Sequence, residues 1–261
     1  MEQQEVLALF DRQMRREFRL EGSSARVDRS DTIVRQTGAP EDWSAVVWSG
    51  LDAGTADAEI AEQVRHFTSL GLGFEWKLYG HDQPADLGDR LREAGFAPED
   101  EETLMVAAIS ELALDVKPPA GVRFDEVTDA AGVDLMVDVS EQAFGAPSPG
   151  QRHRLLDQLT EDPANVRLIV AMAGDEPVCA ARLELSPGTA FASLWGGGTV
   201  RAWRGKGVYR ALVAHRARIA ADLGYEYLQV DASSQSRPIL ERLGFTALTV
   251  TVPYQFPAPA R

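Results

Sequence analysis

The sequence predicts an α/β fold in two domains. Segments with a helical apolar repeat alternate with short apolar, β-branched runs along the whole chain. A Pro/Gly cluster at 116–120 interrupts this alternation. The two sides of the cluster also differ in charge, because residues 1–115 hold 24 acidic and 11 basic side chains, against 16 and 15 in the remainder. We therefore expect a domain over 1–115, a linker over 116–120 and a second domain over 121–261.

The first domain is expected to begin with a long amphipathic helix that includes Val6, Leu9, Phe10, Met14 and Phe18. Its further elements are predicted as strands near 32–36 and 45–48, a helix through 60–67, a strand at 74–78, a helix at 87–96 and a strand at 103–106. The closing strand, helix and Gly-Phe ending resemble those of residues 225–245. Two interpretations stay open: a duplicated domain, or chance recurrence of a common α/β pattern.

The second domain alternates strands and helices more regularly. In chain order we expect a strand beginning at 122, helices at 129–144 and 149–160, strands at 166–173, 177–185 and 189–196, a helix at 208–223, a strand at 226–231, a helix at 236–243 and a strand at 245–252. Gly174-Asp175-Glu176 and Ser186-Pro187-Gly188 are predicted hairpin turns between antiparallel neighbours.

Composition excludes several classes of protein. No run approaches 18 consecutive apolar residues, and Met1–Glu5 resembles no signal peptide, so we expect a cytoplasmic protein with no membrane partner. One cysteine and four scattered histidines predict neither a disulfide nor a metal site. A net charge of −14 disfavours non-specific binding to nucleic acid.

A glycine-rich segment between a strand and a helix carries the clearest chemical signal. It reads Gly196-Gly197-Gly198-Thr199-Val200-Arg201-Ala202-Trp203-Arg204-Gly205-Lys206-Gly207-Val208-Tyr209-Arg210. Glycines allow tight turns, and the first turn of the following helix presents unpaired amides at the positive end of its dipole. No acid occurs over 186–221, which holds six bases: Arg201, Arg204, Lys206, Arg210, Arg216 and Arg218. The segment predicts a pyrophosphate site, the alternative being a turn that only packs helix on sheet.

Two common phosphate loops do not match this spacing. A P-loop needs four residues between its glycines followed by Lys-Ser/Thr, and the dinucleotide fingerprint needs Gly-x-Gly-x-x-Gly. The pattern Val200-x-x-x-Arg204-Gly205-Lys206-Gly207 instead resembles the acetyl-CoA loop of the GNAT superfamily of N-acetyltransferases. Ile239-Leu240-Glu241-Arg242-Leu243-Gly244-Phe245 resembles that family's last helix with its Gly-Phe ending, so the resemblance covers about residues 121–256.

The resemblance implies a twisted mixed sheet whose central parallel strands diverge to admit pantetheine, with the first domain a degenerate copy. It implies acetyl-CoA as co-substrate and no metal. The CoA-binding residues that it implies are Gly198, Thr199, Val200, Arg204, Gly205, Lys206, Gly207, Val208, Tyr209 and Ser233. Backbone at 198–200 would bond pantetheine, and amides at 205–209 would hold the pyrophosphate. Tyr209 stands where the family usually has glycine or alanine, so its ring must point away from the ligand.

The proton-transferring residues depart from the family pattern. Leu240 replaces the usual tyrosine of the last helix, and Ser193 stands where some members carry a glutamate base. The remaining catalytic candidates are Ser233, near the family's asparagine position, and Asp231, at a strand end. The Ser233 hydroxyl would donate to pantetheine or to sulfur. Asp231 is either a proton acceptor through water or a cap or turn residue.

Five other residues have two interpretations each. Glu184 faces either the cleft or solvent. His215 and Cys179 are expected to pack in the core rather than act as base and nucleophile. Trp195 and Trp203 either line an acyl or acceptor pocket or belong to the core.

Two functions remain open at this point. The first is an acetyl-CoA-dependent N-acyltransferase that transfers an acetyl group to a primary amine by direct attack in a ternary complex, where positioning supplies much of the catalysis. The second is a non-catalytic CoA or acyl-CoA sensor. The oligomeric state, monomer or homodimer, is also open.

Charge suggests where each substrate binds. The first domain has no glycine loop, and its segment 50–57 is acidic where phosphate would need cations, so we expect no CoA there. The excess of acids in that domain, with those on the first helix of the second (Asp129, Asp134, Asp138 and Glu141), predicts a cationic acceptor amine or peptide N-terminus. The alternative is an ordinary solvated acidic surface.

Overall fold

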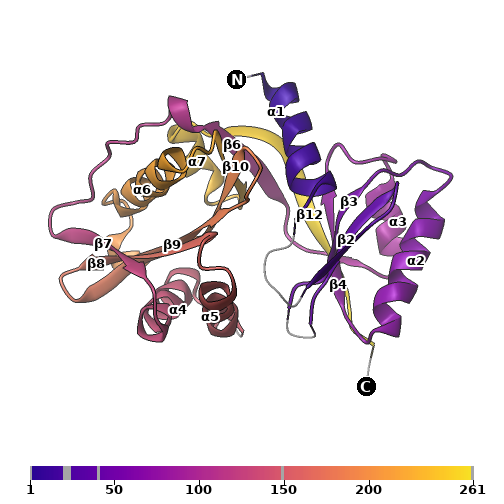
Figure 1. Ribbon diagram of the computed structural model, residues 1–261, viewed down its shortest axis with the longest axis horizontal. Helices are drawn as coiled ribbons and strands as arrows, with labels where there is room; N and C mark the ends of the chain where they lie inside the picture. The colour runs from indigo at the N-terminus through magenta and orange to yellow at the C-terminus, as the bar shows by residue number, and fades with distance from the viewer. Residues whose placement is uncertain (1, 20–24, 40–41, 148–149, 260–261) are drawn as a thin grey trace. The chain divides into compact units, whose positions relative to one another are not determined.

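The computed structural model, shown in Figure 1, describes residues 2–19, 25–39, 42–147 and 150–259. Contacts divide the chain into two compact units. Unit 1 comprises Met1–Met105, Asp231–Pro238 and Ala247–Arg261, and unit 2 comprises Val106–Val230 and Ile239–Thr246. The predicted linker at 116–120 lies within unit 2, and two segments expected in the second domain belong to unit 1. The compact units therefore divide the chain differently from the predicted domains.

Unit 1 contains a mixed sheet. Its elements are α1 (Gln3–Phe10), the π-helical turn η1 (Asp11–Arg16), β1 (Arg26–Arg29), β2 (Ile33–Thr37), β3 (Ala45–Ser49), α2 (Ala56–Ser69), β4 (Phe74–Tyr79), α3 (Leu87–Glu93), β5 (Ala97–Pro98), the first part of β6 (Glu102–Ala108) and most of β12 (Thr246–Phe256). Strands β1, β2 and β3 are antiparallel, and β3 runs parallel to β4.

The C-terminal strand belongs to unit 1 because it completes that unit's sheet and core. Residues 251–256 of β12 pair antiparallel with β4. Tyr254 lies in the same buried cluster as Phe67 and Trp76, and Phe256 packs against the Phe74 ring at 5.7 Å between centroids. Burial of aromatic rings of this size contributes strongly to stability, so the strand is fixed by tertiary packing rather than by its neighbours in sequence.

Unit 2 contains a mixed sheet in which antiparallel pairing predominates. Its elements are the end of β6, the 3-10 turn η2 (Ile109–Glu111), β7 (Val122–Val127), α4 (Ala130–Phe144), α5 (Gln151–Glu161), β8 (Val166–Ala173), β9 (Glu176–Leu185), β10 (Phe191–Thr199), η3 (Arg201–Trp203), α6 (Val208–Asp222), most of β11 (Tyr227–Ala232) and the end of α7 (Arg237–Arg242). Strands β7 to β10 are antiparallel neighbours in chain order, and β11 joins β10 in parallel.

The predicted element order is confirmed, with local corrections. The first helix changes to π-helical geometry at Asp11. The sequence reading missed β1, whose four residues have little apolar character. It ended β10 at Gly196, but antiparallel pairing with β9 carries the strand through the glycines to Thr199. Pro149, the predicted start of the second helix of the second domain, lies outside the described residues.

The same order of elements occurs in both units. The run β1-β2-β3-α2-β4-α3 in unit 1 matches β8-β9-β10-α6-β11-α7: three antiparallel strands, a helix, a parallel strand and a short helix. This repetition favours a duplicated domain over chance recurrence. Across the described ranges, no helix is long and apolar enough to cross a membrane.

Candidate functional site

The two parallel strands of unit 2 stay paired over a short distance only. Their register runs from Phe191↔Tyr227 to Ser193↔Gln229, whereas β10 continues to Thr199. At the end of the pairing, Gln229 Nε2 donates to Ser193 Oγ over 2.6 Å, and both side chains are buried. A parallel pair that stops in mid-strand leaves the far half of one strand edge without partners. This agrees with the divergence that the family resemblance implies.

The segment between β10 and α6 presents consecutive unpaired amides. Gly205 and Gly207 adopt left-handed φ values of 74° and 87°, and a Cβ added at either would meet no atom within 4 Å. Gly207 precedes α6 and gives it no side-chain cap. Within the described residues, the amides of residues 205–210 have no acceptor. Open space, free amides and the positive helix end fit a bound pyrophosphate.

Arg204 fixes this segment to its surroundings. Its Nε donates to the Thr199 carbonyl over 3.1 Å and its Nη2 to the Ala143 carbonyl at the end of α4 over 2.6 Å. The same end of α4 lies against Gly198, where an added Cβ would come within 2.9 Å of Ala143 Cβ. Two of the donor groups of Arg204 therefore bind backbone carbonyls, and the side chain holds the loop against the end of α4.

The Tyr209 ring packs against the glycine-rich segment from the protein interior. A Cβ at Gly197 would lie 2.7 Å from Tyr209 Cε2, so the ring fills the space that this glycine leaves. Burial raises the pKa of the Tyr209 phenol, opposed by the nearby Arg216 guanidinium. Arg216 is itself fully buried and donates to the Arg182 carbonyl over 3.0 Å. The ring points into the protein, as the sequence required of it.

The expected role of the Val200 backbone is corrected. Its amide donates to the Val178 carbonyl over 3.0 Å, and its carbonyl accepts from the Trp203 amide over 2.9 Å. This amide is not free for pantetheine, because the hydrogen bonding of this segment to β9 continues one residue beyond the end of β10, whereas the predicted strand ended at Gly196. Gly198 and Thr199 lie at the end of β10, beyond the predicted end of the strand, and their contact with pantetheine stays a prediction.

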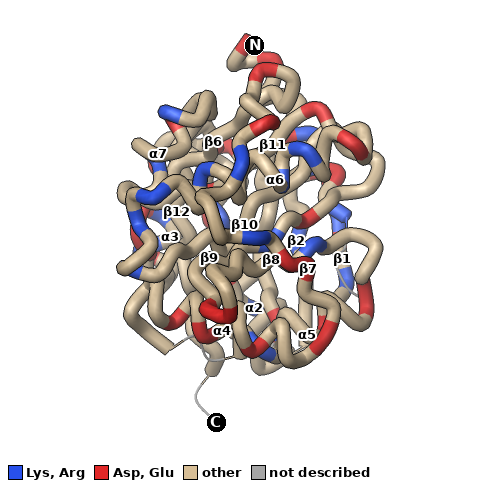
Figure 2. Tube along the Cα trace, turned by 90° about the vertical axis from the view of Figure 1, so that its left-hand side faces the viewer, with Lys and Arg blue, Asp and Glu red and all other residues tan. Residues whose placement is uncertain are grey.

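Cations surround the loop. Lys206 is exposed, with Nζ 4.4 Å from the centroid of the half-buried Trp203 ring. Figure 2 shows basic residues along the tube near α6 and acidic residues at α4 and α5. Two of the acids of the α4 region are already engaged: Asp129 caps the helix through the Gly132 amide, and Asp134 pairs with Arg152 over 2.6 Å. Asp138 remains exposed.

In unit 1, the turn before α2 corresponds to the glycine loop before α6, and a carboxylate of that turn already accepts hydrogen bonds from its amides. Asp52 Oδ1 accepts from the amides of Gly54 and Thr55 and from the Thr55 hydroxyl, at 2.8 to 3.0 Å. These hydrogen bonds, the Thr55 hydroxyl first, lower the pKa of Asp52. The acid occupies the turn before α2 where a phosphate would need free amides, which supports the expectation that unit 1 binds no CoA.

The two catalytic candidates lie in unit 1 and have partners there. Asp231 Oδ2 forms an ion pair with Lys77 Nζ at 2.6 Å, with 5% and 14% of the two side chains exposed. Its Oδ1 is buried without a hydrogen-bond partner. Ser233 is exposed, and its Oγ lies 3.3 Å from both the amide and the hydroxyl of Ser236 ahead of α7. Asp231 is thus a buried ion-pair member, and Ser233 stabilises the turn before the helix.

The sequence reading missed the charged cluster around that ion pair. Burial would lower the pKa of Lys77, but Asp231, Tyr79 and Glu75 together raise it above its ordinary value. Burial also raises the pKa of Glu102 to about 7, with Lys77 opposing and Asp231 and Glu75 adding to the shift. A carboxyl that titrates near neutrality suits proton transfer. The sequence signal for this cluster is the alternation of ionisable residues along β4. This alternation does not show that their side chains are buried.

The other candidate residues take structural positions. Glu184 is buried, and its Oε1 accepts from Arg182 Nε over 2.6 Å and from Gln158 Nε2 over 2.9 Å. Cys179 is buried, where burial raises its thiol pKa, and Sγ lies 3.1 Å from Thr199 Oγ1. The His215 ring packs 5.1 Å from Phe124, and burial lowers its pKa.

The remaining three residues are placed as follows. Leu240 is fully buried and carries no hydroxyl, so this side chain supplies no proton. Trp203 packs against the core of unit 2, and the Arg182 guanidinium lies 5.5 Å from the Trp195 ring centroid. In the described part of the chain, no group of three His, Cys, Asp or Glu side chains is arranged to hold a metal ion.

Comparison with known proteins supports the interpretation of unit 2. Residues 133–245 match the model of the acetyltransferase (GNAT) family. This confirms the resemblance drawn from the glycine loop and the Gly-Phe ending, and it indicates acyl transfer from an acyl-CoA. Among curated proteins, none matches the chain significantly.

Solved structures share the fold over nearly the whole chain. A GCN5-related N-acetyltransferase from Kribbella flavida is 16% identical with a TM-score of 0.69, covering 90% of this chain and 91% of that one. A functionally unknown conserved protein from Staphylococcus epidermidis ATCC 12228 is 13% identical with a TM-score of 0.68, covering 93% and 97%. A tandem GNAT protein from the clavulanic acid biosynthesis pathway is 13% identical with a TM-score of 0.60, covering 94% and 87%. At such identities the likeness shows the fold alone.

Proposed function

We propose that the protein is an N-acyltransferase that transfers an acetyl group from acetyl-CoA to a primary amine, because residues 133–245 match the model of the GNAT acetyltransferase family. The observation that carries this proposal is the row of free amides over 205–210 at the uncapped start of α6. Acetyl-CoA supplies the acyl group as a thioester. Overall, a C–N bond forms, the C–S bond breaks, and the amine proton passes to the thiol.

Asp231 and Ser233 are the residues we propose for proton handling. Asp231 keeps one buried oxygen without a partner, and Glu102 adds a second carboxyl that is partly ionised at neutral pH. Ser233 offers an exposed hydroxyl. The side chains at Leu240 and Ser193 transfer no proton in this scheme, so orientation of the two substrates carries a large part of the rate.

We also propose that the acceptor is a cation. The support is the net charge of −13 over residues 1–115, against −1 for the remainder, which attracts a cationic amine over a long range. Asp129 and Asp134, two of the acids from which a cationic acceptor is predicted, already have partners. The support is therefore the overall negative charge rather than those two side chains.

The function is tested by thiol release from acetyl-CoA with three matched amines: 1,4-diaminobutane, butylamine and 4-aminobutanoate. We expect kcat/KM to fall in that order, with differences that shrink when ionic strength rises from about 20 mM to about 300 mM, because salt screens the field. Preference for the carboxylated amine would contradict the cationic acceptor. CoA binding without thiol release from a broad amine library would favour the sensor instead.

Ser233→Ala is expected to lower kcat about tenfold while the Kd for CoA stays within about twofold, as expected for a group that acts on the reaction rather than on binding. Ser236→Ala is the matched control, because that serine shares the same turn and hydrogen bonds. Equal kcat values in the two variants would leave Ser233 with a structural role only. Titration of CoA by calorimetry and steady-state kinetics give the two quantities.

A further inference from the structure

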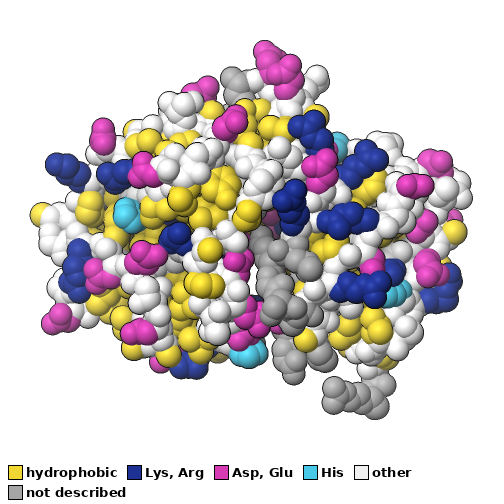
Figure 3. Space-filling view, in the orientation of Figure 1, with side chains coloured by type: hydrophobic (Ala, Val, Ile, Leu, Met, Phe, Trp, Pro, Cys, Tyr) yellow, Lys and Arg dark blue, Asp and Glu magenta, His cyan; other side chains and the backbone are white. Residues whose placement is uncertain are grey.

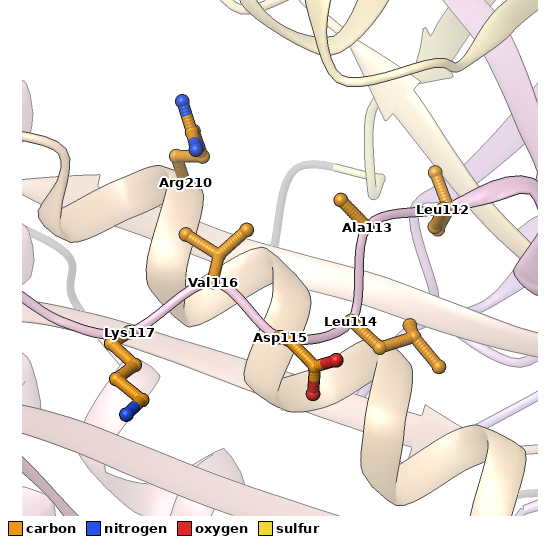
Figure 4. Close-up of a pocket in the computed structure, with 7 residues that line it drawn as sticks. All are labelled: Leu112, Ala113, Leu114, Asp115, Val116, Lys117 and Arg210. Carbon is orange, nitrogen blue, oxygen red and sulfur yellow. The ribbon is translucent and has the colours of Figure 1, made fainter.

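Reactive side chains outside the glycine loop gather in unit 1 rather than around the pocket of unit 2. That pocket, drawn in Figure 4, has a volume of about 700 Å³ and is lined by 112–117 and Arg210. None of these lining residues carries a hydroxyl, a thiol or an imidazole. In unit 1, by contrast, a hydroxyl, an imidazole and a carboxylate lie in a row: Thr249 of β12, His81 after β4 and Asp11 at the start of η1.

The distances in this row are those of a nucleophile, its base and the group that orients the base. His81 Nε2 lies 2.7 Å from Asp11 Oδ2, and His81 Nδ1 lies 3.3 Å from Thr249 Oγ1. Burial would raise the pKa of Asp11, but His81 and Arg15 together lower it below its ordinary value, so this carboxylate only accepts. Nε2 therefore carries the proton of the neutral ring, which leaves Nδ1 as the acceptor for the Thr249 hydroxyl. The other acceptor within reach of that hydroxyl, the Val250 carbonyl, is slightly farther away at 3.4 Å.

A buried arginine holds the carboxylate in place. Arg15 Nη1 donates to Asp11 Oδ1 over 2.7 Å, and Arg15 Nη2 donates to both carboxylate oxygens of Asp82. Asp11 and Arg15 both belong to η1, and π-helical geometry is rare and frequently occurs at functional sites. Because Asp82 already neutralises Arg15, the buried ion pair does not require an imidazole beside it.

The imidazole end of the row is open to solvent. Histidine side chains are among the groups that reach the molecular surface in Figure 3. The side chain of His81 is 30% exposed and that of Asp11 is 25% exposed, and Thr249 is half-buried. A Cβ at Gly80 would come within 3.3 Å of Thr249 Oγ1, so the glycine before His81 lets β12 lie this close to the ring. A small molecule can therefore approach the hydroxyl and its base together.

We propose that Thr249, His81 and Asp11 hydrolyse esters of small carboxylic acids through an acyl-threonine. Thr249 Oγ attacks the ester carbonyl carbon while its proton passes to His81 Nδ1, and the ring returns that proton to the alcohol as the bond between alcohol oxygen and acyl carbon breaks. Water then attacks the acyl-threonine and gives a proton to Nδ1, which passes it to Thr249 Oγ as the carboxylic acid leaves. This reaction uses neither acetyl-CoA nor the glycine loop, so it goes beyond the proposed function.

Hydrolysis of 4-nitrophenyl acetate by the full chain, in the absence of CoA, tests the proposal. Thr249→Val removes the hydroxyl at nearly constant volume and His81→Gln removes the base, and we expect each to lower kcat/KM about 100-fold. Asp11→Asn should lower it about tenfold, because the ring loses the carboxylate that orients it. Thr249→Ser keeps the hydroxyl and should stay within about threefold of the wild type. Peptide mass spectrometry should find the acetyl group on Thr249, as an ester that neutral hydroxylamine removes.

His66→Gln is the matched control. His66 Nε2 lies 3.5 Å from Thr37 Oγ1 in the same unit, but among the described residues no carboxylate lies within hydrogen-bond distance of that ring. This variant should hydrolyse the ester at the wild-type rate. A wild type no faster than His81→Gln, an unchanged rate in Thr249→Val, or acetyl groups found only on other residues would overturn the proposal while leaving the proposed function intact. Ester hydrolysis without acetylation of any amine would instead contradict the proposed function alone. Thermal melting verifies that each variant is folded.

Discussion

Gly207→Glu is expected to abolish CoA binding, with Kd raised at least about 100-fold, that is about 2.7 kcal/mol. Gly207 lies at the start of α6 with φ of 87° and open space around it, so a glutamate would extend over the free amides. Its carboxylate would compete for those amides and repel the pyrophosphate. Calorimetry with CoA measures the effect, and CoA-induced thermal stabilisation provides a second readout.

Two control variants accompany Gly207→Glu. The first separates the effect of the added charge from that of backbone strain, and the second tests whether unit 1 binds CoA. Gly207→Ala carries the same left-handed strain without the charge, and we expect CoA affinity to change by no more than about threefold. Gly54→Glu places an acid in the corresponding turn of unit 1, beside the resident Asp52, and should leave binding unchanged at one CoA per chain. Undiminished CoA binding by folded Gly207→Glu, or two CoA molecules per wild-type chain, would contradict the loop assignment.

Lys77→Met is expected to destabilise unit 1 by about 3–5 kcal/mol, because it leaves Asp231 as a buried carboxylate without its cation. Protonation of the lone carboxyl would relieve this cost. The pKa of Asp231 in the folded variant is then raised above its value in the unfolded chain. The loss of stability is therefore complete at a pH above the folded-state pKa, and it becomes smaller as the pH falls toward the unfolded-state pKa. Hydrogen exchange of the β4 amides measures the local free energy of opening, which suits a chain of two units.

A double variant distinguishes the ion pair from general damage to the core. Lys77→Met with Asp231→Leu removes both charges, and we expect stability within about 1 kcal/mol of the wild type. Arg92→Met is the matched control, because its ion pair with Asp89 is exposed and contributes at most about 1 kcal/mol. An additive loss in the double variant would show that Lys77 acts through packing rather than through Asp231.

Local features of the chain could be predicted from sequence because their causes are local. The glycines at 205 and 207, the cations around them and the helix that follows lie within a few residues of one another, and together they define an anion site. Apolar periodicity gave the element order for the same reason. Even the orientation of Tyr209 followed from its position, since a ring directed at the ligand would block the loop.

By itself, then, the sequence determined the α/β class, the order of the elements and the phosphate loop, whereas tertiary structure decided which partner each charged residue has. Lys77 and Asp231 are 154 residues apart, and neither neighbourhood indicates that they pair. Arg204 donates a hydrogen bond to the carbonyl of Ala143, 61 residues away in sequence. Strand β12 pairs with β4 and so belongs to the sheet of unit 1. These contacts depend on burial and long-range packing, which apolar periodicity along one segment does not contain.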